Sequence, residues 1–206
     1  MLTLILDTTL NGLTLALAKG DEIVARYTTA APRSATTMHP HLVLLLEEVD
    51  AAASDISKVV LTVGPGSFTG IRLGIAVADA LQLVRPDVEI VGTGTLGVMG
   101  LWGYGMMGKE ITTWGNAFGG QVFVGRFGAD GAPLGKVACM PLAEAEATLH
   151  DGDVLVAGMG IITNARVDVW VDVLPPEAIL DAARLYPLPP LPLYIKDLGY
   201  RKVGEA

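Results

Sequence analysis

The stretch from Lys58 to Leu81 constrains the fold more than any other part of this chain. It begins with a β-branched run, continues as Gly64-Pro65-Gly66-Ser67-Phe68-Thr69-Gly70, and ends in an apolar run of helical length. That order predicts a strand, a glycine-rich turn and a helix in direct succession. Ser67 and Thr69 both suit the N-cap of the predicted helix.

Two uses of this turn are open on the residues alone. A glycine-rich turn at a helix N-terminus exposes backbone N–H groups that attract an anion, but a tight turn also serves packing alone. The turn is not a Walker A loop, because no Gly-Lys-Ser/Thr follows. It is not the dinucleotide fingerprint either, because the third glycine comes one place late, at Gly70.

Size and composition indicate a chain with a large core. The 206 residues suffice for one large domain or two small ones. Although 51% of them are hydrophobic, no uncharged apolar run reaches the roughly 18 residues that cross a bilayer, so we expect no membrane span. The N-terminus has no basic region and Asp7 interrupts its first apolar run, which predicts no signal peptide. Cys139 stands alone, which excludes a disulfide framework and suits a reducing, cytoplasmic setting.

The charge balance argues against direct binding of nucleic acid. The formal net charge is −8, and the 14 Lys and Arg residues are scattered along the chain. Nucleic-acid binders usually carry a basic patch that replaces the counterions of the phosphates. If this protein acts on RNA, we expect another protein to hold the RNA.

The order of the elements predicts a mixed sheet with helices on its faces. Three antiparallel strands at 2–6, 13–17 and 22–29 open the chain, and Asn11-Gly12 marks the first hairpin turn. A helix at 39–53, with Pro40 in its first turn, precedes the strand at 58–63, the helix at 70–84 and a strand at 88–91.

The second half of the sequence starts another set of strands. We expect strands at 110–114, 121–127, 134–140, 153–157 and 167–173, helices at 141–149 and 177–186, and an extended proline-rich tail. The segment 96–107 reads equally as a loose helix or a loop. Two related α/β halves follow, with a domain boundary at 92/93, and Asn116-Ala117-Phe118-Gly119-Gly120 takes the place that Asp7-Thr8-Thr9 holds in the first half.

Two of the predicted helices are too apolar for ordinary surface helices. Leu42-Val43-Leu44-Leu45-Leu46 covers every face of the first helix, and the second has only a narrow polar stripe. A second subdomain can supply the extra cover, but we favour another protein. The expected interface residues are Leu42, Leu45, Leu46, Val49, Gly70, Ile71, Gly74, Val77, Ala78 and Leu81.

Two further candidates carry weaker signals. Asp7, at the end of the first strand, can bind a metal-bound phosphate, but an Asx-turn or a cap is the favoured interpretation. His39 and His41 are two residues apart and point to different helix faces, whereas zinc-binding helices use a spacing of four. We therefore expect a capping or surface role for these histidines, and no metal site.

Three motifs together resemble the TsaB (YeaZ) family of bacterial tRNA threonylcarbamoyladenosine biosynthesis proteins. They are Leu6-Asp7-Thr8-Thr9, the run from Gly64 to Gly74, and Pro192-Leu193-Tyr194-Ile195. The central motif is highly specific, and the resemblance covers most of the chain. It weakens between about 93 and 107 and again from 158 to 187, where this chain looks short.

The resemblance implies a two-lobed fold of the actin/sugar-kinase/Hsp70 (RNase H-like) kind and a cytoplasmic, non-catalytic subunit without a cofactor. Such a subunit supports the TsaD-type enzyme that attaches threonylcarbamoyl to the adenosine beside the anticodon, in a complex that a TsaE-type ATPase joins. The family pairs with TsaD, or with itself as a homodimer, through two helices that correspond by position to 39–53 and 70–84. Contact with tRNA then comes only through the complex.

One departure from the family supports the non-catalytic interpretation. Many relatives open the second-lobe segment with Asp-Ala-Arg, whereas this chain has Asn116-Ala117-Phe118, which removes a carboxylate and a cation. The remaining anion or nucleotide site would consist of Asp7, Thr8, Thr9, Gly64, Gly66 and Ser67.

Two enzymatic alternatives compete with this interpretation. Asp7 and the glycine-rich turn suit an independent ATP-binding phosphotransferase or ATPase of the actin-like superfamily. A peptidase with Ser67 as its nucleophile is less well supported, because the chain lacks the Gly-x-Ser-x-Gly elbow and a placed histidine.

Overall fold

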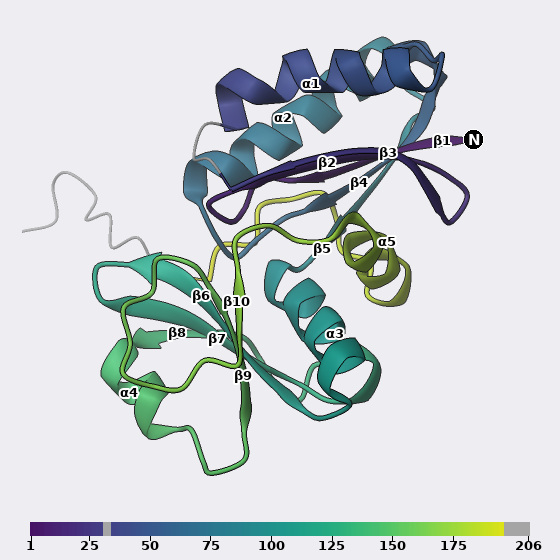
Figure 1. The fold of residues 1–206 in the computed structure, drawn as a ribbon. Coiled ribbons are helices and arrows are strands. Elements are labelled where there is room, and N and C mark those ends of the chain that lie inside the picture. Colours follow the sequence, from purple (N-terminus) through teal and green to yellow (C-terminus); the bar gives the residue numbers. More distant parts are fainter. Residues whose placement is uncertain (31–33, 196–206) are drawn as a thin grey trace, which may run out of the picture.

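Two five-stranded sheets, one in each half of the chain, form the frame of the molecule (Figure 1). The computed structural model describes residues 1–30 and 34–195. The first sheet has the order β3-β2-β1-β4-β5, in which β1 pairs antiparallel with β2 and parallel with β4. Its strands are β1 (Leu2–Asp7), β2 (Leu13–Lys19), β3 (Glu22–Thr29), β4 (Ile56–Thr62) and β5 (Glu89–Thr93).

The second sheet repeats the topology of the first. Its order is β10-β9-β6-β7-β8, and β6 pairs antiparallel with β7 and parallel with β9. The strands are β6 (Ile111–Phe118), β7 (Gln121–Phe127), β8 (Ala138–Pro141), β9 (Val154–Gly158) and β10 (Val169–Val171). Central strand β6 thus corresponds to β1, as predicted, and the expected two-lobed α/β fold with mixed sheets is confirmed.

Helices cover both faces of the first sheet (Figure 1). One face carries α1 (Ser34–Glu48) and α2 (Phe68–Val84). The opposite face carries α5 (Pro176–Leu185), and α3 (Thr95–Met107) contacts both α5 and the second sheet. The remaining elements are α4 (Leu142–Ala147) beside β7 and β8 and the short 3₁₀ turns η1 (Ala53–Asp55) and η2 (Ala129–Gly131). None of the helices among the described residues is long and apolar enough to span a membrane.

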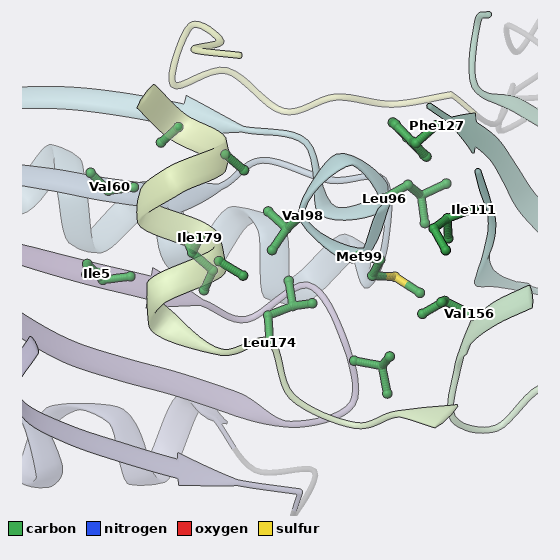
Figure 2. Close-up of a cluster of buried hydrophobic side chains, with 14 of the residues drawn as sticks. Ile5, Val60, Leu96, Val98, Met99, Ile111, Phe127, Val156, Leu174 and Ile179 are labelled. Carbon is green, nitrogen blue, oxygen red and sulfur yellow. The ribbon is translucent and has the colours of Figure 1, made fainter. Parts of the chain in front are cut away.

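One buried cluster joins the two sheets (Figure 2). Ile5 and Val60 from the first sheet, Met99 from α3, Val156 from the second sheet and Ile179 from α5 all belong to it. The chain after α5 then returns to the first sheet, where the backbone of Leu188 exchanges hydrogen bonds with Gly92 and Leu193 N–H donates to the Val63 carbonyl. The domain boundary at 92/93 stays a prediction.

The first helix begins earlier than predicted. It starts at Ser34 instead of residue 39, so Pro40 lies inside the helix and not in its first turn. A proline at this position removes a helical hydrogen bond, but burial of Met38, Leu45 and Leu46 in the core stabilises the helix around it. The helix also ends earlier, because Asp50 has a left-handed φ of 52° and Ala51 N–H donates back to the Leu46 carbonyl.

The segment 96–107, which the sequence predicts equally as a loose helix or a loop, is part of helix α3. Its glycines allow close packing: a Cβ on Gly100 would stand 2.5 Å from the Phe127 ring, and one on Gly103 would stand 2.9 Å from Val156. Gly108 ends the helix with a left-handed φ of 64°. The other predicted elements of the second half are present with shifted ends: β6 extends to Phe118, β8 begins at Ala138 instead of residue 134, and β10 shrinks to three residues.

Candidate functional site

The glycine-rich turn connects β4 to α2 as predicted, and Ser67 is the N-cap of the helix. Its Oγ accepts a 3.1 Å hydrogen bond from the backbone N–H of Gly70. Gly64 has a φ of +108°, and a Cβ there would stand 2.9 Å from the Leu193 carbonyl oxygen. The turn therefore needs glycine at this position both for its backbone conformation and for the close approach of the C-terminal segment.

The end of β1 fills the space inside this turn. A Cβ on Gly66 would stand 2.3 Å from the carbonyl oxygen of Thr9, and a Cβ on Gly70 would stand 1.7 Å from that of Thr8. Ser67 N–H donates to the Thr9 carbonyl at 2.8 Å, and the Thr8 hydroxyl donates to the Gly70 carbonyl at 2.6 Å. Two backbone donors that an anion would use, the N–H groups of Ser67 and Gly70, are thus already satisfied within the chain, which favours the structural interpretation of the turn.

Asp7 lies beside the turn with none of its surface exposed. Its Oδ1 accepts hydrogen bonds from the Thr9 backbone at 3.0 Å, from the Thr9 hydroxyl at 2.6 Å and from the Thr62 hydroxyl. The Thr9 hydroxyl also lies 2.8 Å from that of Thr95 at the start of α3. The bond from Thr9 N–H is the predicted Asx-turn.

Burial raises the pKa of the Asp7 carboxyl group above its ordinary value of 3.8, although the hydrogen bonds from Thr62 and Thr9 act in the opposite direction. Its second oxygen, Oδ2, has no hydrogen-bond partner among the described protein groups. Asp7 is thus a buried acid held by threonine hydroxyl groups, an arrangement typical of a structural role. Nowhere among the described residues do three or more His, Cys, Asp or Glu side chains gather to hold a metal.

The cleft where the two lobes meet is narrow. Thr9, Asn11 and Gly66 of the first lobe face Asn116 and Met159 of the second across a cavity of about 20 Å³. Asn11 Nδ2 donates to the Met159 carbonyl at 3.3 Å, which ties the lobes together. A cavity of this size holds about one water molecule, so a nucleotide would need the lobes to move apart.

A larger cavity of about 390 Å³ lies between the start of α2 and the β6–β7 connection. The rings of Phe68 and Tyr194, two of its lining residues, stack with their centroids 5.3 Å apart. The Arg72 guanidinium lies 3.7 Å from the centroid of the Phe68 ring, and its Nε donates to the Tyr194 hydroxyl at 3.0 Å. The sequence pointed to Tyr194 only through the family resemblance and did not link it to Arg72, which lies 122 residues away.

The ten expected interface residues all lie on or just beyond α1 and within α2, but they differ in exposure. Six are buried within the chain itself, and the other four are partly buried in the same core. The six are Leu45, Leu46, Gly70, Ile71, Gly74 and Ala78. The most exposed apolar side chains on these helices were not predicted: Leu44 is 57% exposed, Leu83 85% and Val84 81%.

Of the two histidines, His39 has the expected surface position, whereas His41 is half-buried and packs against β3. His41 stacks on Tyr27 with the ring centroids 3.6 Å apart, and its Nδ1 lies 2.7 Å from the Thr37 carbonyl oxygen. His39 is exposed. The Oγ of Ser67 is used as a helix cap, and no hydrogen bond from a histidine to Ser67 is found in the described part of the chain.

Comparison with known proteins finds two matches by sequence. A family model described as "TsaD: tRNA N6-adenosine threonylcarbamoyltransferase" matches residues 22–99. The chain is also 29% identical to the tRNA threonylcarbamoyladenosine biosynthesis protein TsaB of Bacillus subtilis over 98% of its own length and 88% of the relative. Both matches support the similarity to the TsaB (YeaZ) family that the three sequence motifs indicated.

Two solved structures share the fold of this chain. Pseudomonas aeruginosa YeaZ superposes with a TM-score of 0.75 at 21% identity, covering 94% of this chain and 99% of that one. A P. aeruginosa protein described as similar to the peptidase YeaZ gives 0.76 at 21% identity, covering 95% and 99%. At this identity the likeness shows the fold alone.

Proposed function

We propose that this chain is a non-catalytic subunit that supports a TsaD-type threonylcarbamoyltransferase in the modification of tRNA at the adenosine beside the anticodon. The observation that carries the proposal is the packing of the Thr8 and Thr9 backbone into the turn between Gly64 and Gly70. A turn that cradled an anion would have to leave this place open to it. Here the chain itself occupies it, while relatedness to TsaB supplies the pathway.

The partner surface in this proposal lies on α1 and α2. Leu44 on α1 and Leu83 and Val84 at the end of α2 expose apolar area on the same side of the first sheet (Figure 1). Exposed apolar side chains on adjacent helices favour a helical partner face. The buried residues of the same helices, such as Leu45 and Ala78, hold these helices on the sheet.

The remaining partners follow from the charge and the family. A net charge of −8 favours contact with tRNA through the TsaD-type subunit rather than by this chain. A TsaE-type ATPase joins the same complex, and a homodimer through the α1–α2 surface competes with the heterodimer.

The experiment is a mass measurement by light scattering on the purified chain, on the TsaD-type subunit of the same genome, and on their mixture. The proposal predicts a complex that contains both chains. Two separate species at micromolar concentration would contradict it. The isolated chain shows in the same experiment whether it is a homodimer.

An independent ATP-binding enzyme stays the second candidate, because Asp7 stands at the end of β1 next to the cleft between the lobes. Titration calorimetry with ATP and Mg²⁺ separates the two functions. Tight binding by the isolated chain that Asp7→Ala abolishes would favour the enzyme.

A further inference from the structure

Phe118, the last residue of β6, occupies an unfavourable position. Its φ is 56°, in the left-handed region where a Cβ is disfavoured, and the residue is 61% exposed to solvent. Gly119 and Gly120 follow with φ values of 64° and 73°. Asparagine or glycine would adopt this backbone conformation at lower cost, and either would expose less apolar surface to solvent. A bulky residue at a strained, exposed position points to function rather than to folding.

Phe118 lines three cavities, which we call the three hollows. They are the 390 Å³ cavity at the start of α2, the 20 Å³ cavity between the lobes, and one of about 260 Å³ beside Ile161 and Ile162. Among the described residues that line them there is no Asp, Glu, Lys, Arg or His. The cavities themselves are therefore lined by uncharged residues, and Arg72 lies beside them against Phe68 and Tyr194.

Bulky apolar side chains stand around these hollows. Phe68 is 37% exposed, Tyr194 45% and Ile162 92%. The nearby Arg72 is engaged with the Phe68 ring and the Tyr194 hydroxyl. Aromatic residues at the centre of an uncharged patch are typical of the anchoring core of protein interfaces.

We propose that the cleft-mouth surface, formed by Phe118, Phe68, Tyr194 and Ile162, binds an uncharged apolar segment of a protein partner, with Phe118 as its central anchor. A charged side chain inserted into these cavities would lose its hydration without gaining an opposite charge, because none of the described lining residues is charged, so the cavities favour an apolar occupant. The cavities accept bulky apolar side chains of that segment.

The cleft-mouth surface is separate from the exposed apolar residues at the end of α2. Phe68 begins this helix and Leu83 lies near its end, about 22 Å away at the helical rise. A partner that spans both regions therefore makes two independent contacts. The test uses the TsaD-type subunit as its probe, so in that respect this inference rests on the proposed function.

The experiment measures the affinity of the full chain for the purified TsaD-type subunit and the thermal unfolding midpoint of the chain alone. Phe118→Asn should lower the affinity about tenfold or more, since it removes an anchoring ring. It should also raise the midpoint by a few degrees (roughly 2–4 °C), because asparagine adopts the left-handed conformation at lower cost. Ile162→Asn, at a 92% exposed position, should lower the affinity without changing the midpoint. The matched control Leu134→Asn, at an exposed position outside the three hollows, should change neither.

Four results overturn the inference. If Phe118→Asn and Ile162→Asn bind normally while Leu83→Lys weakens binding, the cleft-mouth surface is not a contact and the proposed function stands. If Phe118→Asn lowers the midpoint and leaves the affinity unchanged, the ring serves the fold. If it reduces only self-association of the isolated chain, the occupant is a second copy. If the unaltered chain does not bind the TsaD-type subunit at all, the proposed function fails together with the inference.

Discussion

The hydroxyl of Thr8 donates a 2.6 Å hydrogen bond to the carbonyl of Gly70, 62 residues further along the chain. The carbonyl oxygen of Thr8 comes so close to the same glycine that a Cβ there would lie 1.7 Å from it. The end of β1 and the start of α2 are thus joined by direct backbone packing. A turn whose sequence suits an anion cradle works here as a tight junction between two elements.

Gly70→Ala should destabilise the chain strongly. The added methyl group overlaps the Thr8 carbonyl, which is backbone and cannot move aside, so we expect a loss of about 3 kcal/mol or more in the free energy of unfolding. Urea unfolding measures it. The control is Gly105→Ala in α3, where a Cβ meets nothing within 4 Å. That variant should gain roughly 0.5–1 kcal/mol from helix propensity. Equal effects of the two substitutions would refute the close packing at Gly70.

Asp7→Asn should change how stability depends on pH. Burial raises the folded-state pKa of Asp7 above its unfolded value near 3.8, so the folded chain binds this proton more tightly than the unfolded chain. The stability contributed by the proton is complete below pH 3.8 and is lost as the pH rises through the folded-state pKa. Asparagine keeps an acceptor for Thr9 and Thr62 but does not ionise.

The pH test compares the urea midpoints of the Asp7→Asn variant and the unaltered chain between pH 3 and pH 8. The variant should gain stability relative to the unaltered chain as the pH rises, with the smallest difference at the acid end. A difference that stays constant across this range would show that Asp7 does not titrate with a raised pKa. Asp7→Ala, which also removes the acceptor, should be less stable than Asp7→Asn at every pH.

Leu83→Lys should weaken association with the TsaD-type subunit without unfolding the chain. Leu83 is 85% exposed, and lysine is well tolerated near a helix C-terminus. We expect the affinity, measured by titration calorimetry, to fall about tenfold or more if this leucine anchors the partner. Leu185→Lys, at the exposed end of α5 on the opposite face of the sheet, is the matched control. If both variants bind like the unaltered chain, the partner surface lies elsewhere.

The isolated chain should give no binding heat with ATP and Mg²⁺. The cavity between the lobes measures about 20 Å³, and Ser67 N–H is already bonded to the Thr9 carbonyl. Saturable binding at micromolar ATP would show that the lobes open readily and would revive the enzymatic alternative.

Local sequence signals predicted most of the frame. Three features depend on residues close in sequence and are present: the β1–β2 hairpin, the strand–turn–helix around Gly64 and the capping role of Ser67. The hairpin connection is the longer loop 8–12, which contains Asn11-Gly12. The repeat of one topology in both halves, with Asn116 near the end of β6 as Asp7 is at the end of β1, also followed from the order of the segments.

Features set by distant packing were harder to predict. Pro40 suggested a helix start, but burial of Met38 and Leu45 carries α1 through the proline. Glycines made the segment 96–107 ambiguous because their partners, Phe127 and Val156, lie far along the chain. For the same reason an apolar stripe did not show which side was exposed: Leu45 is buried in the sheet's core, whereas Leu44 and Leu83 face solvent.

The most direct test of the account is a reconstituted modification assay on tRNA. The TsaD-type subunit, a TsaE-type ATPase, tRNA and the threonylcarbamoyl donor are incubated with and without this chain, and threonylcarbamoyladenosine is measured by mass spectrometry of digested tRNA. Efficient modification should require both this chain and the TsaD-type subunit, and this chain alone should produce none. Full modification without this chain, or modification by this chain without the TsaD-type subunit, would contradict its role as a supporting subunit.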